Sequence, residues 1–191
     1  MQQSKFITSL STGCFLLRSI LRWFRHFTAK RHYTKNASDK GVKPQMVIMR
    51  ILDKFTSKNP QQIWSASCEV AKCNNLELLD SLAVDIIAIE NATKGITLGG
   101  ALCPNSYHLE FALKKLRYVK NRAGCLCALY SEYMFFNPID EEKNGNITII
   151  EIVKIDGKWI DYHICKCNKC HSSYKVEERG GHFAFWSWQK A

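Results

Sequence analysis

The most reactive side chains of this sequence gather in two short stretches, one near residue 125 and one near residue 167. Cys125 and Cys127 follow the turn-prone residues 121–124, at the point where a new apolar helix is predicted to begin. The unpaired N–H groups of a first helical turn and the positive end of the helix dipole favour a thiolate. We therefore expect a cysteine nucleophile, with Cys125 as the first candidate and Cys127 as the alternative.

A histidine downstream is suited to act as the base for this thiol. Asp156-Gly157 is a strong signal for a two-residue hairpin turn, so His163 is expected on the second strand of a hairpin. Because side chains alternate along a strand, His163 shares its face with Cys165 and Cys167. Its imidazole could take the proton of the Cys125 thiol and return it during catalysis.

Two further roles are needed to complete such a catalytic site. The residue that fixes the imidazole tautomer stays open among Glu177, Glu178 and the nearer Asn168. Backbone N–H groups at the start of the helix would hold an oxyanion, with Asn121 as the side chain that could assist them.

The same cysteines also allow a metal site. Cys165, Cys167, Cys170 and His171 supply soft and borderline ligands, and the Cys-x2-Cys spacing within them is typical of tetrahedral zinc. Cys125-x-Cys127 adds two thiols, but successive residues of a regular helix are turned by about 100°, so these two are not expected to share one metal easily. Zinc and catalysis could also coexist, with zinc on the later cluster.

Simpler interpretations apply to each of these residues. Cys127 on an apolar helix is most simply a small buried side chain, and so are Cys68, Cys73 and Cys103. His163 could equally be a histidine of the core, with His182 as a spare candidate base. The charged residues 177–179 are most simply a solvated loop.

The elements that would position these residues follow from hydrophobic periodicity. Helices are predicted over residues 44–57, 60–73 and 76–94 (ended by Gly95), and a fourth opens after residues 103–106 and runs to about 119. An almost wholly apolar, buried helix is predicted over 125–136. After a polar loop at 139–146, strands are predicted over 147–155 and 158–167, with a last strand over 180–188. The predicted class is α+β, with a helical subdomain followed by a central buried helix on a small antiparallel sheet. The single domain would cover 46–191, divided into 46–120 and 121–191.

This order, with Gly124-Cys125 at a helix start, Tyr162-His163 on the following sheet and Glu177-Glu178 further on, resembles the transglutaminase-like and papain-like thiol superfamily. It is most similar to the compact cysteine domains of bacterial toxins and effectors. The resemblance implies a papain-like or transglutaminase-like fold. It also implies a cofactor-free deamidase, protease or transglutaminase that acts on amide groups of a protein substrate. The alternative is a zinc-stabilised protein-binding module without catalysis.

The charge of +10 is concentrated near the N-terminus. Residues 1–45 hold nine Lys and Arg against the single acid Asp39, whereas the rest of the chain is close to neutral. The folded part therefore lacks the basic surface typical of nucleic-acid binding, and no nucleic-acid partner is expected.

Residues 5–28 predict a basic amphipathic helix. Within a segment spanning 1–33, arginines recur beside an apolar stripe, which is typical of a mitochondrial targeting peptide or of a helix on an anionic membrane surface. Residues 34–45 are polar and predict a linker. The odd count of nine cysteines favours a reducing compartment such as the cytoplasm, or the host cytoplasm for an effector. The oligomeric state stays open.

Overall fold

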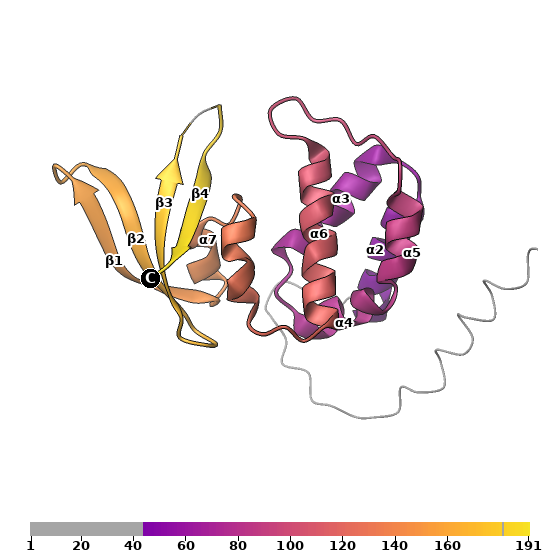
Figure 1. Cartoon of the computed structure of the whole chain (residues 1–191), viewed down its shortest axis with the longest axis horizontal. Helices are drawn as coiled ribbons and strands as arrows, with labels where there is room; N and C mark the ends of the chain where they lie inside the picture. Colours follow the sequence, from indigo (N-terminus) through magenta and orange to yellow (C-terminus); the bar gives the residue numbers. More distant parts are fainter. Residues whose placement is uncertain (1–43, 181) are drawn as a thin grey trace, which may run out of the picture. The chain divides into compact units, whose positions relative to one another are not determined.

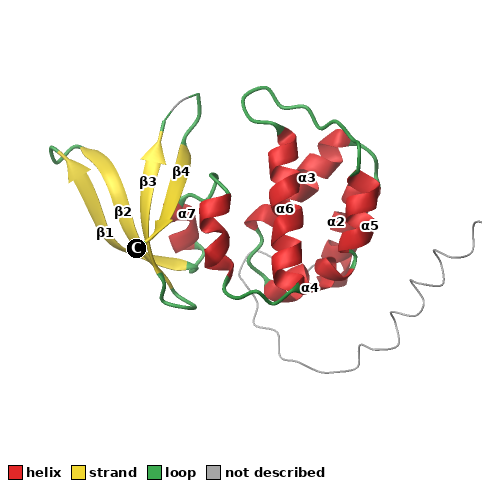
Figure 2. Cartoon of the chain, viewed as in Figure 1, coloured by secondary structure: helices red, strands yellow, loops and turns green. Residues whose placement is uncertain are grey.

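The computed structural model describes residues 44–180 and 182–191, and these described residues belong to one compact unit (Figures 1 and 2). The predicted basic helix over 5–28, the segment 1–33 and all of the predicted linker except residues 44 and 45 lie outside the described residues. None of the helices in the described part of the chain has the length and apolar character needed to cross a bilayer.

The fold class is α+β, as predicted. The described chain begins with α-helices α2 (Pro44–Thr56), α3 (Pro60–Lys72), α4 (Leu76–Val84), α5 (Ile86–Thr93) and α6 (Asn105–Lys120). They are followed by the 3-10 helix η1 (Leu126–Glu132), the short helix α7 (Pro138–Lys143) and an antiparallel sheet. Its strands β1 (Ile147–Ile155), β2 (Trp159–Cys167), β3 (Ser173–Arg179) and β4 (Phe185–Lys190) are neighbours in chain order (Figure 1).

Asparagine caps and proline starts set the helix boundaries. The Asn59 side chain accepts hydrogen bonds from the backbone N–H groups of Gln61 and Gln62 at the start of α3. The single helix predicted over 76–94 is wrong, because α4 and α5 are separated at Asp85, whose N–H bonds to the Leu82 carbonyl only three residues back. Gly95 does adopt the expected left-handed backbone, with φ of 75°.

The helical part is built around a core of mostly aliphatic side chains. Its largest fully buried side chains come from α2 to α6 and include Phe55, Ile63, Val70, Leu79, Leu82, Ile89 and Leu116. These side chains are buried and recur every three or four residues, which is why the apolar stripes in the sequence predicted helices here. The buried ammonium of Lys115 on α6 donates to the carbonyls of Ala71 and Cys73 at 2.7 and 2.6 Å, and so ties α6 to the end of α3.

The sheet part differs from the prediction at several points. The polar residues 139–146 include helix α7, residues 173–179 form strand β3 instead of ending in a solvated loop, and the last strand covers 185–190. The hairpin turn at Asp156-Gly157 is confirmed, since both residues have positive φ and Lys158 N–H bonds to the Ile155 carbonyl.

The predicted buried helix over 125–136 is also wrong in kind. Only residues 126–132 are helical, and they form a 3-10 helix that ends where Tyr133 turns extended. Its buried side chains Cys127, Leu129 and Tyr130 join an aromatic cluster with Tyr174 and Trp188 of the sheet and Phe111 of α6. Helices with three residues per turn are usually short. The residues after η1 are held by aromatic packing instead, since Tyr133 and Phe136 belong to the same cluster.

Candidate metal centre

The turn before Cys125 is shaped by backbone positions that few residues tolerate. After α6 ends at the cap residue Asn121, Arg122 and Gly124 take positive φ values of 49° and 129°. The Tyr118 hydroxyl donates to the carbonyls of Ala123 and Cys125 at 3.1 and 3.2 Å. A Cβ atom on Gly124 would approach that hydroxyl oxygen to 3.1 Å, so both conformation and space favour glycine here.

The two early cysteines are therefore not on a regular α-helix. Cys125 is the cap residue of η1 with extended backbone (φ −73°, ψ 137°), and its carbonyl accepts the Ala128 N–H at 3.1 Å. Cys127 lies in the first turn of η1. The expectation that their thiols diverge assumed about 100° per residue of an α-helix, and the extended cap removes that assumption. The Sγ atoms of Cys125 and Cys127 therefore lie within 4.8 Å of each other.

The later pair forms a tight turn at the end of β2. His171 N–H bonds to the Cys167 carbonyl and Cys167 N–H bonds to the Ser172 carbonyl, both at 2.9 Å. His171 accommodates the reversal with φ of 61°. Inside the turn, the Lys169 N–H donates to the Cys167 sulfur at 3.4 Å. This contact leaves the Cys167 sulfur as the acceptor inside the turn.

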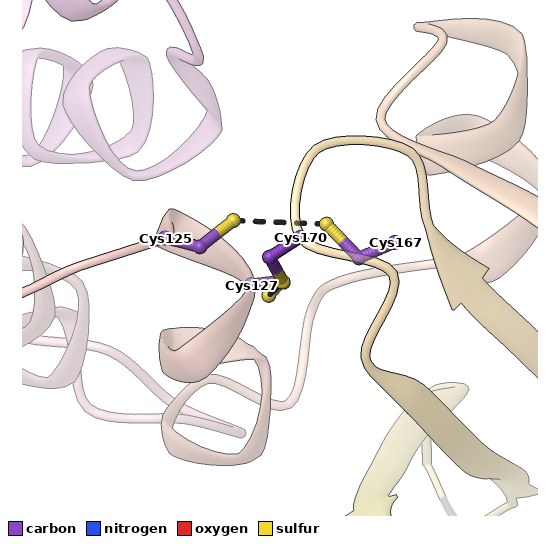
Figure 3. Close-up of side chains that lie close together, drawn as sticks. All are labelled: Cys125, Cys127, Cys167 and Cys170. Atoms are coloured by element: carbon purple, nitrogen blue, oxygen red, sulfur yellow. Dashed lines mark hydrogen bonds between the residues drawn. The ribbon is translucent and has the colours of Figure 1, made fainter.

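These two segments bring four sulfur atoms together (Figure 3). The Sγ atoms of Cys125, Cys127, Cys167 and Cys170 all lie within 4.8 Å of one another. Cys125 faces Cys167 at 3.6 Å and Cys127 faces Cys170 at 3.2 Å. Four sulfurs bound tetrahedrally at a Zn–S distance of about 2.3 Å would be separated by about 3.8 Å. The cluster therefore has the ligand type, number and spacing of a tetrahedral metal site.

The environment shifts the pKa values of these thiols in opposite directions. Burial raises the pKa values of Cys125 and Cys127 above the ordinary 9.0, whereas contacts with Ser172 lower the pKa of the exposed Cys170 to about 6. A divalent cation would displace the protons and bind the thiolates. Lys169 lines the same small pocket as Cys125, Cys127 and Cys167. Within residues 44–180 and 182–191, this is the one group of three or more metal-ligating side chains so close together.

His163, the predicted base, lies elsewhere on the sheet. It is buried on the same face of β2 as Cys165 and Cys167, as predicted, yet neither of its ring nitrogens has a hydrogen-bond partner among the described residues. Cys167 lies four positions after His163 on β2, or about 13 Å along the strand, and the Cys125 sulfur lies beside that of Cys167. The structure therefore does not bring Cys125 and His163 together as a thiol–imidazole pair.

The other predicted catalytic residues have different neighbours. The Asn168 side chain accepts from the Thr148 hydroxyl at 2.8 Å and donates to the Gly145 carbonyl at 3.0 Å, which ties β2 to β1. Glu177 pairs with Lys175 and Arg179 on an open face of β3. Glu178 is exposed near the end of β3, where its charge acts on His163 to raise the histidine pKa, although burial dominates and lowers it.

Asn121 is the exposed cap of α6, and its described hydrogen bonds are those of its backbone N–H to the carbonyls of Arg117 and Val119. Two of the four predicted zinc ligands belong to the observed cluster and two do not. Cys167 and Cys170 belong to the cluster, but Cys165 and His171 do not, and Cys125 and Cys127 take their places. Cys165 lies two positions before Cys167, about 7 Å along β2, and is fully buried.

No protein family model matches the chain, and comparison with curated proteins and with solved structures gave no match either. The resemblance to the transglutaminase-like superfamily stays a prediction.

Proposed function

We propose that the protein is a zinc-stabilised protein-binding module, in which Cys125, Cys127, Cys167 and Cys170 hold one structural Zn²⁺. The observation that carries this proposal is the convergence of four thiol sulfurs, from two segments far apart in sequence, within 4.8 Å. Single buried cysteines are common as small core side chains, but four thiols from two segments at this spacing match the donor set of a tetrahedral zinc site.

The donor set favours a structural metal over a catalytic one. Four thiolates complete a tetrahedron, so no position is left for water or substrate, whereas catalytic zinc sites keep one open. Tetrahedral sulfur sites also suit iron, and metal analysis separates the two. The site would join η1 to the turn between β2 and β3, two segments that otherwise meet through the aromatic cluster around Tyr130.

Apolar side chains left exposed on the sheet support the binding role. The hairpin of β1 and β2 exposes large hydrophobic residues near its turn, of which Trp159 is 75% and Ile155 51% accessible. Ile150, Ile152 and Ile160 of the same two strands are also exposed. Trp159 and Ile160 are consecutive on β2 and so face opposite sides of the sheet, and large apolar side chains exposed on one hairpin are candidates for contact with a partner.

The test is the metal content of the full chain purified from zinc-containing medium. We expect about one zinc per chain, loss of that zinc from Cys127→Ala, and a tetrahedral thiolate spectrum after replacement by Co²⁺. Cys165→Ala is the matched control, because Cys165 neighbours the centre in sequence but lies outside the cluster. A chain without metal, or equal metal content in Cys127→Ala and Cys165→Ala, would contradict the proposal.

The thiol amidohydrolase hypothesis makes the opposite prediction for Cys125. A nucleophile poised by its environment reacts with iodoacetamide faster than an ordinary thiol, whether or not a chelator is present. A zinc ligand is protected until a chelator removes the metal. Rapid alkylation of Cys125 in metal-loaded protein would favour the enzyme.

A further inference from the structure

The four cysteines of the centre are not equivalent. Cys170 is exposed, whereas Cys127 and Cys167 are buried and Cys125 is half-buried. The Sγ atom of Cys170 lies 3.2 Å from that of Cys127 on the other segment, whereas the Cys125 and Cys167 sulfurs are 3.6 Å apart. Figure 3 shows that each of these contacts joins one cysteine of the η1 segment to one cysteine of the later turn.

We infer that the centre is also a site of oxidative modification, at which Cys170 is oxidised by a peroxide and Cys127 closes a disulfide across the two segments. The release of metal that follows rests on the proposed zinc site, whereas the disulfide pairing rests on the sulfur geometry alone. Closure requires the two sulfurs to approach by about 1 Å, to the S–S length of about 2.05 Å.

The chemistry balances with hydrogen peroxide as the oxidant. The Cys170 thiolate attacks one peroxide oxygen, the O–O bond breaks, and hydroxide leaves while a sulfenic acid forms. The Cys127 thiolate then attacks the Cys170 sulfur, the S–O bond breaks, and a second hydroxide leaves. The two sulfurs together lose two electrons, and the peroxide gains them. A metal held by four thiolates would lose two of its ligands in this step.

The alternative pairing lies within the later turn. Cysteines three residues apart can form a disulfide, as in Cys-x-x-Cys redox motifs, so Cys167 competes with Cys127 for the oxidised Cys170. The structure favours Cys127, because the Cys167 sulfur accepts the Lys169 N–H at 3.4 Å and faces Cys125. The new bond would therefore keep η1 attached to the β2–β3 turn after the metal leaves.

Trypsin separates the two pairings, because Lys166 and Lys169 flank Cys167 on both sides. The full chain, with its metal content measured first, is treated with about one equivalent of peroxide, alkylated and digested. We expect the peptide of residues 123–143 disulfide-linked to that of 170–175, with fragmentation locating the bond at Cys127. We also expect about one zinc released per disulfide formed. A link between 167–169 and 170–175, or none to 170–175, would overturn the inference.

Two variants make the test sharper. Cys127→His keeps a zinc ligand but removes the preferred resolving thiol, so we expect more sulfenic acid on Cys170, trapped by dimedone, than in the unsubstituted chain. Cys103→Ser, outside the cluster, should oxidise as the unsubstituted chain does. Absence of metal before oxidation would count against the zinc site alone, whereas wrong disulfide pairing in loaded protein would count against this inference alone.

Discussion

The helical part and the sheet part of this protein are held together by different forces. Helices α2 to α6 enclose a core of mostly aliphatic side chains, in which Phe55, Leu79 and Leu82 are fully buried. The sheet part packs a smaller aromatic cluster and adds four converging cysteines. A helical stripe that is buried on folding is stabilised by hydrophobic contact, whereas the proposed zinc would add metal–thiolate bonds to the sheet part. The stability of the two parts should therefore respond to different changes.

Metal removal has the largest expected effect. Structural zinc contributes on the order of 10 kcal/mol to the folding of small zinc domains, so chelation or Cys127→Ala should expose amides of β1 to β4 and η1. The amides of α2 to α6 should stay protected, because their core does not include the centre. Hydrogen exchange followed by mass spectrometry measures both parts in one experiment. Equal loss of protection in both parts would show that the protein unfolds as one unit.

The reverse experiment removes a large side chain from the core of the helical part. Phe55 of α2 is completely buried in the helical cluster, so Phe55→Ala should lower the free energy of unfolding by about 3–5 kcal/mol. Zinc content per folded chain should be unchanged. Urea unfolding followed by circular dichroism gives the first value, and metal analysis the second. Loss of zinc from the folded variant would contradict the separation of the two parts.

Two glycines allow a matched comparison between the parts. Gly124 (φ 129°) precedes Cys125, and a Cβ atom added to Gly124 would lie 3.1 Å from the Tyr118 hydroxyl oxygen. Gly95 (φ 75°) follows α5, and a Cβ atom added to it would meet no other atom within 4 Å. Gly124→Ala should cost about 1–3 kcal/mol and weaken zinc binding in competition with a chelator. Gly95→Ala should cost about 1 kcal/mol and leave zinc affinity unchanged. Equal zinc affinities in the two variants would mean that the turn at Gly124 does not position Cys125.

Sequence patterns predicted the parts of the fold that depend on neighbouring residues. The apolar stripes of α2, α3 and α6 and the turn at Asp156-Gly157 appeared at the expected positions, because each depends on side chains within a few residues. Strand β3 has the same kind of local signal, since Tyr174 and Val176 alternate with charged residues and are buried. The run of charge at 177–179 obscured it.

The site was predicted only in part because its geometry depends on distant segments. The Cys167-x2-Cys170 turn is a local pattern and was recognised. Cys125-x-Cys127 was placed on an α-helix because the residues after it are apolar on all sides, as a buried helix would be. The signal that could have corrected this is Gly124, a residue suited to positive φ, directly before Cys125. The separation of Cys125 from His163 follows from strand register, which no local spacing reports.

The smallest expected effect concerns His163, the buried histidine that the centre does not use. Burial lowers its pKa below the ordinary 6.5, with Glu178 and Glu142 opposing the shift. The unfolded chain therefore binds this proton more readily, so wild-type stability should fall as pH decreases below about 6.5. His163→Leu removes two unpartnered ring nitrogens and should raise the free energy of unfolding by about 1 kcal/mol near pH 7. Metal-ligand thiolates also bind protons in acid, so the quantity to measure is the difference between the two proteins.

That difference should grow as pH decreases from about 7 to about 5, because only the wild type loses the contribution of a neutral His163. Urea midpoints at several pH values, measured with zinc present, give the result. The exposed His182 provides the control, since His182→Gln should leave the midpoint unchanged at every pH. A difference that shrinks in acid would mean that His163 is better accommodated as a cation, paired with Glu178 or Glu142. The sheet part would then add a buried ion pair to its aromatic cluster, and its stability would depend on charge even without the metal.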